Sequence, residues 1–297
     1  MNRNFVLNLK SKFYRSSNSK DSRESILFLS SRNQKNLLLN ECTIEDVLPH
    51  LLVHSSIATI DSKEKMWVAT SMLVRFLETF TNNLVVVEND VPVGRLGWEE
   101  VIKEFAKTHD SSFFSDMMVQ QVMNNDLCII PQKTKVSDLL KKMYQMQRDF
   151  ALVRNENEEY STISARRLLE AGVLCNTRMK ISDIPLKIIP TFNRDDTIDT
   201  IMKQMIQNET EILVLENTPQ FINPQIIFEK IVELNYLKNI NNFFDLKATV
   251  LNLRIGKIIS ENTTITDMCK IMLSMKYPFI MTLNNVLTPW DLIMTFS

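Results

Sequence analysis

Few side chains in this sequence of 297 residues are suited to chemistry, and they stand far apart. His50 and His54 are four residues apart in DVLPHLLVH, which would place both on one face of a helix. No Glu lies between them and no third ligand is evident. His109 is isolated along the chain, and no serine or cysteine has the local sequence of a nucleophile. We therefore predict no metal site, no catalytic residues and no enzymatic activity.

The cysteines and glycines further limit which kinds of metal or nucleotide site the chain could form. Cys42, Cys128, Cys175 and Cys269 form no Cys-x-x-Cys pair, which is typical of small core residues in a reducing compartment. The chain has only four glycines and no glycine-rich phosphate loop, so a bound nucleotide would depend on side chains and helix N-termini. No apolar run is long enough for a signal peptide or a membrane span. We expect a cytoplasmic protein without a membrane partner.

Charge is distributed unevenly, although the formal net charge is only −1. Residues 1–40 carry eight Lys and Arg against one Asp and one Glu, a balance of +6. This basic N-terminal extension also contains Phe and Tyr, a mixture that could bind nucleic acid or an acidic partner. A solvated extension is the more common role of such a segment. Nucleic acid is therefore not the favoured partner.

Four stretches of the chain share one pattern: an amphipathic helix, a short apolar strand, an acidic or Asn-rich turn, a second strand and another helix. A short apolar run, IATI, CIIP, KIIP or KIIS, precedes each one. The first helices of the second and third units show apolar residues at i, i+3, i+4, i+7 and i+8, which predicts one buried stripe per helix. These stripes are Val136, Leu139, Leu140, Met143 and Tyr144, and Ile198, Ile201, Met202, Met205 and Ile206.

The last helix of each unit begins on a comparable four-residue stretch. Gly97, Ser164, Asn223 and Thr288 occupy its first position, and all four are accepted N-caps. In T288-P-W-D291, Pro follows the cap and Asp stands at N3, a favourable helix start in itself. The fourth position is less easily explained by folding, because it varies widely. It reads Glu100, Arg167, Ile226 and Asp291, at intervals of 67, 59 and 65 residues.

This arrangement resembles the cystathionine-β-synthase (CBS) domain family. The resemblance covers residues 43–297 and lies in a β-hairpin, preceded by a Met-rich helix, whose second strand leads into Thr/Ser-x-x-Asp. It implies an α/β (α+β) fold with four CBS-type β-α-β-β-α repeats paired into two Bateman modules. The expected domains are the extension 1–40, a first pair 41–172 and a second pair 173–297. Four repeats look like the γ subunit of the AMP-activated kinase and stand-alone archaeal four-repeat proteins.

The resemblance also implies a ligand site. In the CBS family the fourth position is a carboxylate that accepts both ribose hydroxyls of an adenine nucleotide, and the Thr or Ser contacts a phosphate. Only Thr288 with Asp291 matches the full motif. Glu100 follows a glycine, Arg167 reverses the charge, and Ile226 removes it. The purine would lie against the first strand of the fourth unit and the strand after its helix, which implies Lys257, Ile258, Ile259, Pro278 and Ile280, with Arg254 and Lys257 near phosphate.

These features predict a non-catalytic regulatory protein with no metal or catalytic cofactor. It would sense an adenine nucleotide (AMP, ADP or ATP) or S-adenosylmethionine through a CBS-pair cleft and transmit the signal to a partner protein or to a second copy of itself. The alternative is a ligand-free scaffold with decayed sites, since three of the four helix starts depart from the motif. A nucleic-acid-binding module acting through residues 1–40 is a third reading.

Overall fold

A computed structural model describes residues within one compact unit, 36–297. The predicted extension 1–40, the pair His50 and His54, and Cys175 lie outside the described residues. Among the described residues, no helix combines the length and the apolar character needed to span a bilayer. The described ranges are 42–47, 58–76, 83–174, 178–184, 188–232, 243–282 and 285–296.

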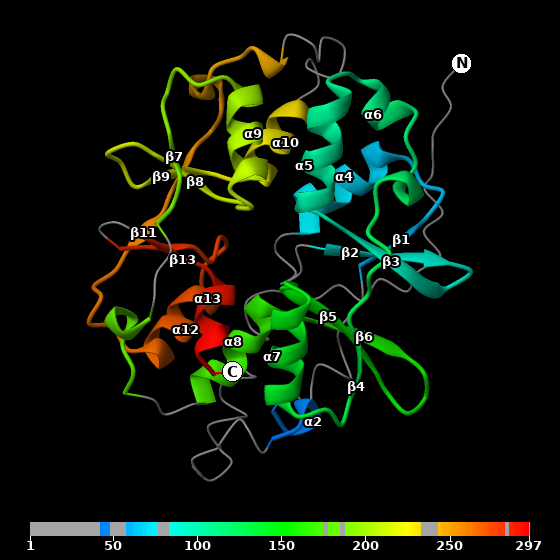
Figure 1. The fold of residues 1–297 in the computed structure, drawn as a ribbon, viewed down its shortest axis with the longest axis vertical. Helices are drawn as coiled ribbons and strands as arrows, with labels where there is room; N and C mark the ends of the chain where they lie inside the picture. The colour runs from blue at the N-terminus through cyan, green and yellow to red at the C-terminus, as the bar shows by residue number, and fades with distance from the viewer. Residues whose placement is uncertain are drawn as a thin grey trace. The chain divides into compact units, whose positions relative to one another are not determined.

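The first two repeats have the predicted order of elements (Figure 1). In both, the first strand pairs parallel with the second, and the second pairs antiparallel with the third. The first repeat comprises β1 (Thr59–Asp61), α4 (Met66–Phe76), β2 (Asn83–Glu88), β3 (Val91–Gly97) and α5 (Trp98–Thr108). The second comprises β4 (Ile129–Pro131), α7 (Val136–Gln145), β5 (Phe150–Arg154), β6 (Tyr160–Ser164) and α8 (Ala165–Leu174).

The third and fourth repeats follow the same order with shorter strands, and β10 (Arg254–Ile255) adds a fourth strand to the third sheet by pairing with β9. The third repeat comprises β7 (Thr191–Phe192), α9 (Ile198–Gln207), β8 (Leu213–Leu215), β9 (Gln220–Ile222) and α10 (Pro224–Val232). The fourth comprises β11 (Lys257–Ile258), α12 (Ile265–Leu273), β12 (Ile280–Met281), β13 (Val286–Leu287) and α13 (Pro289–Ile293), which is followed by the 3-10 turn η5 (Met294–Phe296).

Two details of the sequence prediction are wrong. The strand expected at KIIP (residues 187–190) begins just after this run, at Thr191–Phe192. This strand buries Phe192, whereas Ile188 of the predicted strand is 88% exposed. Tyr144, at i+8 of the predicted stripe, is 58% exposed. At 100° per residue it has rotated past the edge of the stripe. The other members of that stripe, Val136, Leu139, Leu140 and Met143, are buried as predicted.

Three of the four hairpin turns have left-handed backbone, and in two of them it falls at Asn or Asp, as predicted. Asn89, Asp90 and Asn217 have φ of 49°, 64° and 57°. In the second repeat Glu158, not an Asn, takes this conformation, with φ of 64°. Asn155 stabilises that turn in another way, because its Oδ1 accepts hydrogen bonds from the backbone of Asn157 and Glu159. The fourth turn lies partly outside the described residues.

The helices pack between the pairs of repeats. α5 packs on α9 and α4 on α10, so helices of the first and third repeats share one core. Trp98 stacks on Phe228 with ring centroids 5.2 Å apart. α8 packs on α12 and α13, which joins the second repeat to the fourth. There the approach is so close that a Cβ on Gly172 would lie 2.6 Å from Cys269 Sγ.

The sheets, in contrast, pack within each pair. Val85 of β2 shares a buried cluster with Phe150 and Leu152 of β5. In the second pair, Phe221 of β9 lies 5.6 Å from Phe279, which directly precedes β12. The sheets thus join repeat 1 to 2 and repeat 3 to 4, while the helices join repeat 1 to 3 and repeat 2 to 4.

The segments that precede the repeats are exchanged within each pair. Cys42 O accepts a 2.9 Å bond from Val136 N of the second repeat, just before α2 (Ile44–Val47). Met117 O, between α6 (Ser112–Ser115) and η2 (Val119–Gln121), accepts a 3.1 Å bond from Met66 N of the first repeat. The segments containing η3 (Ile181–Asp183) and η4 (Ala248–Val250) repeat this exchange between the fourth and third repeats. The structure therefore has four CBS-type repeats in two pairs, and the boundary at residues 172 and 173 stays a prediction.

Candidate functional site

The start of the last helix in each repeat is built as the sequence predicts. Ser164 Oγ accepts a hydrogen bond from Arg167 N at 3.3 Å, and Asn223 Oδ1 accepts one from Ile226 N at 3.1 Å. Thr288 Oγ1 accepts from Asp291 N at 3.3 Å, and Gly97 is the N-cap of α5. Capping therefore explains the first position of every motif.

In the fourth repeat Thr288 and Asp291 form a closed capping box. Asp291 Oδ2 accepts hydrogen bonds from Thr288 N at 2.8 Å and from Thr288 Oγ1 at 2.7 Å. Both residues are partly buried. Only one carboxylate oxygen takes part in these bonds, so Oδ1 lies outside the capping box. One of the two oxygens of the predicted carboxylate therefore helps to cap the helix.

The residues predicted to hold a purine lie in one sheet with differing exposure. β11 is an edge strand beside β12, and Lys257 pairs with Ile280, which pairs in turn with Leu287 just before Thr288. Lys257 and Ile258 are exposed, the latter by 61%. Ile259 is partly buried, whereas Pro278 and Ile280 are buried.

Arg254, predicted to lie near phosphate, has protein partners. Its Nη2 lies 3.0 Å from Glu229 Oε2, and its guanidinium lies 5.6 Å from the ring centroid of Tyr277. A phosphate at this position would have to share Arg254 with the carboxylate of Glu229.

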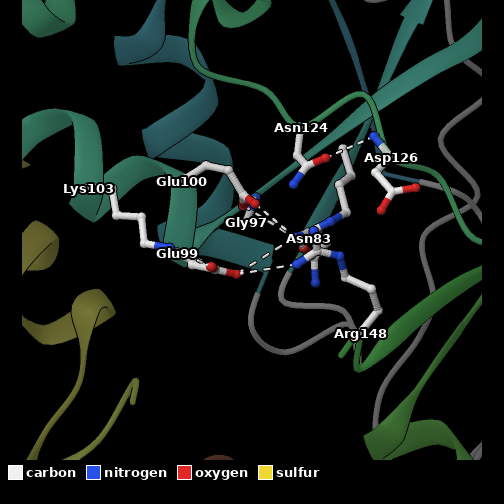
Figure 2. A network of polar contacts seen from close by, with 9 residues as sticks. Asn83, Gly97, Glu99, Glu100, Lys103, Asn124, Asp126 and Arg148 are labelled. Atoms are coloured by element: carbon white, nitrogen blue, oxygen red, sulfur yellow. Dashed lines mark hydrogen bonds and ion pairs between the residues drawn. The ribbon is translucent and has the colours of Figure 1, made fainter. Parts of the chain in front are cut away.

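In the first repeat the corresponding carboxylate belongs to a buried network (Figure 2). Glu100 Oε2 accepts a 3.0 Å hydrogen bond from Gly97 N, which is the only half of a capping box that a glycine N-cap allows. Its Oε1 lies 2.7 Å from Arg95 Nη2, with the side chains only 6% and 10% exposed. Arg95 Nη1 also donates to Asn83 Oδ1 at 2.8 Å. Both oxygens of Glu100 are therefore committed within the protein.

The same network explains why position 97 is glycine. A Cβ on Gly97 would lie 2.5 Å from Asn83 Oδ1, closer than a carbon atom can approach. Asn83 is buried and held by Arg95, so it cannot easily move away. Ser or Thr does not fit at this N-cap, and the hydroxyl of the motif is lost because Asn83 fills its place.

Further charged groups converge on this network. Glu99 lies 2.7 Å from Lys103 Nζ, 3.6 Å from Arg148 Nη1 and 3.7 Å from Arg95 Nη2. Figure 2 shows the side chain of Arg148 directed toward Glu99. Burial raises the pKa of Glu99, but the hydrogen bond and charge of Lys103, with the two guanidiniums, bring it below its ordinary value. Nothing in the local sequence signalled the network, because Arg95 stands alone in a strand.

Two carboxyl groups near this network are shifted in the opposite direction. Burial raises the pKa of Asp149, although the charge of Arg95 and a hydrogen bond from Asn83 counteract it. Burial, reinforced by the charges of Asp149, Glu99 and Glu100, raises the pKa of Glu211 to about 8. The charges of this network therefore act on carboxyl groups of the second and third repeats as well.

The second and third helix starts have other roles. Arg167 Nε lies 3.3 Å from Glu170 Oε1, and Ile226 is 2% exposed in the core. The neighbouring Arg166, which the sequence analysis did not single out, donates to Met275 O at 2.6 Å and so connects the second repeat to the fourth. Burial lowers the pKa of Arg166 to about 10.

His109 is not isolated in space, contrary to its position along the chain. Its Nε2 lies 3.0 Å from Asp199 Oδ1, and its ring stacks on Phe244 at 4.2 Å. Within the described residues, no three His, Cys, Asp or Glu side chains form a group that could hold a metal ion. Cys42, Cys128 and Cys269 are buried, as predicted for small core residues.

Two surface pockets in the described part of the chain lie away from Thr288 and Asp291. The larger, of about 500 Å³, lies between the hairpins of the first two repeats and is lined by Thr59, Val85, Val87, Asp90, Val91, Pro92, Glu158, Glu159 and Tyr160. The smaller, of about 170 Å³, lies in the second pair and is lined by Arg194, Gln220, Ala248, Thr249, Leu251 and Leu253.

Comparisons with known proteins identify the fold. No protein-family model matches the sequence. No curated protein matches it either. The structure is similar to a protein of Methanocaldococcus jannaschii for which archaeal homology to g-AMPK has been proposed, with a TM-score of 0.69 and 13% identity over 82% of this chain and 97% of that one. An uncharacterized conserved protein of Pyrococcus horikoshii matches with a TM-score of 0.50 and 10% identity, also over 82% and 97% of the two chains.

A match to less than half of the chain has a lower score. A CBS-domain containing protein of Agrobacterium tumefaciens matches 43% of this chain and 92% of its own, with 16% identity and a TM-score of 0.38. The four repeats and the full-length likeness together confirm the fold predicted from the sequence. This chain has the fold of proteins built from four tandem CBS repeats.

Proposed function

We propose that this protein is a non-catalytic regulator that binds an adenosyl ligand, either an adenine nucleotide or S-adenosylmethionine, at its fourth repeat. Asp291 carries the proposal, because its carboxylate keeps one oxygen outside the capping box at the end of β13. A carboxylate oxygen can accept charge-assisted hydrogen bonds from ribose hydroxyls. The four-repeat fold supports the same assignment.

The remaining contacts would come from the fourth sheet. Lys257 and Ile258 are exposed on β11, and Pro278 and Ile280 belong to the neighbouring strand region. Lys257 would supply a positive charge toward a phosphate, and Ile258 an apolar surface toward the purine. Thr288 already donates its hydroxyl proton to Asp291, so contact with a phosphate would require that hydroxyl to turn.

Transmission to a partner would use the contacts between repeats. A ligand shifts a conformational equilibrium only by its different affinity for the two states. The fourth repeat contacts the second through α8 and α13 and through Arg166, which bonds to Met275 O. A ligand that moves α13 would therefore act first on the second repeat, and through it on a partner surface or a second copy of the chain.

Titration calorimetry with AMP, ADP, ATP and S-adenosylmethionine tests the site. We expect Asp291→Ala to weaken binding of the preferred ligand at least tenfold, since one charge-assisted hydrogen bond contributes about 1.5–3 kcal/mol. Asp267→Ala is the matched control, because Thr264 Oγ1 donates to Asp267 Oδ2 at 2.9 Å in the same capping arrangement on α12. Equal affinity in the wild type and Asp291→Ala would refute the assigned site.

A specific observation favours the second candidate, a ligand-free scaffold. Glu100 is bound on both oxygens and Ile226 is buried, so two of the four positions are committed to the fold. A wild-type protein that binds none of the four ligands but retains a stable protein partner in a pull-down would support the scaffold over the sensor.

A further inference from the structure

The larger pocket has a wall of apolar side chains contributed by both repeats of the first pair. Its volume of about 500 Å³ lies within the range of pockets that hold small molecules. Val85 and Val87 of β2 and Pro92 of β3 line it from the first repeat, and Tyr160 of β6 lines it from the second. A ligand that fills this pocket would therefore contact both repeats.

The packing between the two sheets fixes this apolar wall. Val85 is 1% exposed and shares a buried cluster with Phe150 and Leu152 of β5. Val87 and Tyr160 are partly buried and pack against the same cluster. Because these side chains are already held by the fold, a ligand would lose little affinity to ordering them.

The charged side chains that line this pocket in the described part of the chain are all acidic. Asp90 belongs to the hairpin turn of the first repeat, and Glu158 and Glu159 belong to the turn of the second. In the smaller pocket, by contrast, the charged residue is Arg194. The larger pocket therefore favours a positively charged ligand.

The three carboxylates are engaged by the protein to different degrees. Glu158 forms an ion pair with Arg154. Glu159 Oε2 accepts a 2.8 Å hydrogen bond from Asn155 Nδ2, and Oε1 takes no part in that bond. No hydrogen bond or ion pair of the Asp90 carboxylate occurs within the described ranges. Asp90 and Glu159 therefore have the most capacity to pair with a bound cation.

The spacing of these carboxylates limits which cation could bind. The described His, Cys, Asp and Glu side chains do not come together in groups of three that could hold a metal ion. The carboxylates of the pocket are therefore too dispersed to chelate one compact cation. A ligand with several positive charges, separated by apolar segments, matches both the dispersed carboxylates and the apolar wall.

We propose that the larger pocket binds a linear polyamine, in which ammonium groups are joined by methylene segments. The ammonium groups pair with Asp90 and Glu159, and the methylene segments lie against Val87, Pro92 and Tyr160. The bound polyamine thereby connects the hairpins of the first and second repeats. This site is separate from the proposed adenosyl site, because no lining residue of the larger pocket belongs to the fourth repeat.

Titration calorimetry of the full chain with spermine, spermidine and putrescine tests the proposal. We expect affinity to rise from putrescine to spermidine to spermine, since each step adds one ammonium group, and to fall as salt is added. Asp90→Asn should weaken spermine binding about three- to fivefold, the contribution of one exposed ion pair, and Asp90→Asn with Glu159→Gln about tenfold. Both variants should fold, because Asn accepts the left-handed backbone of position 90 and Gln keeps an acceptor for Asn155.

Glu216→Gln is the matched control, because Glu216 is an exposed carboxylate beside the hairpin turn of the third repeat and is not among the residues that line the pocket. It should leave the affinity for spermine unchanged. Equal spermine affinity in the wild type and the double variant would overturn the proposal. Binding of Mg²⁺ as tight as that of spermine at the same ionic strength would also overturn it, since only a general attraction of cations would then remain.

Oligolysine separates a free polyamine from the lysine side chains of a protein, which carry the same ammonium and methylene groups. Binding of oligolysine without binding of spermine would assign the pocket to a basic protein segment and contradict the proposal. None of these outcomes bears on the test of Asp291, so the polyamine site and the adenosyl site can fail separately.

Discussion

The first and fourth repeats each have a carboxylate at the third residue of their last helix, but the two carboxylates make different contacts. Glu100 caps α5 and forms an ion pair with Arg95 while 10% exposed. Asp291 caps α13 within a two-residue box and uses one oxygen. The two carboxylates therefore occupy the same motif position, but only Glu100 is bonded to a side chain of the neighbouring hairpin.

The difference arises from two residues on the hairpin of the first repeat. Asn83 of β2 pairs with Gly97 of β3, and its Oδ1 accepts a hydrogen bond from Arg95 Nη1. Because Asn83 excludes a side chain at Gly97 and Arg95 takes up Glu100, the position cannot also serve a ligand. A carboxylate at this motif position therefore indicates a binding site only when its oxygens are not already bonded within the protein.

The largest effect should follow from removing the cation of the first repeat. Arg95→Met leaves Glu100 nearly buried without its partner, and breaking a buried ion pair on one side costs about 3–5 kcal/mol. Urea unfolding at pH 7 measures the change. The double variant Arg95→Met with Glu100→Gln should recover much of the loss, since no uncompensated charge remains. A single variant as stable as the wild type would show that the pair is not buried in solution.

Much of the fold could be predicted because its signals are local. The apolar stripe of Ile198, Ile201 and Met202 and the N-caps depend on residues within a few positions of one another. The packing partners could not be predicted, because a stripe shows that a helix is buried but not what covers it. Thus α5 on α9 and α8 on α12 follow only from the three-dimensional structure, as does the exchange of the segments before each repeat.

The sequence predicted the positions of the helix starts but not the residues that surround them. The four helix starts were located correctly, and Asp291 and Glu100 were singled out. Arg95 carries no local signal, because one cation in an otherwise apolar strand usually faces solvent. Glu211, which follows α9 in a polar stretch, likewise looks like an exposed turn residue in the sequence. Long-range charge clusters of this kind are assembled only by the packing of separate repeats.

A smaller effect should follow from filling the space at the first helix start. Gly97→Ala places a Cβ 2.5 Å from Asn83 Oδ1, and overpacking of this kind costs about 1–3 kcal/mol. Chemical unfolding of the variant measures the cost. Asn83→Ala alone removes a hydrogen bond of Arg95, but in the Gly97→Ala background it also relieves the clash. The two changes together should therefore cost less than their sum.

The smallest effect is expected at the fourth helix start, where the carboxylate only closes a capping box. Asp291→Ala removes the acceptor of Thr288 N and Oγ1 and should cost about 1 kcal/mol or less in the free energy of unfolding. Asp267→Ala should have a weaker effect still, because Asp267 is exposed. Hydrogen bonds from Lys270 and Thr264 lower the pKa of Asp267, so its contribution should be present above about pH 4 and fade as pH falls below it. A loss at Asp291 as large as that from Arg95→Met would mean that this carboxylate, like Glu100, is held by groups beyond its own helix, and the contrast between the two repeats would then be wrong.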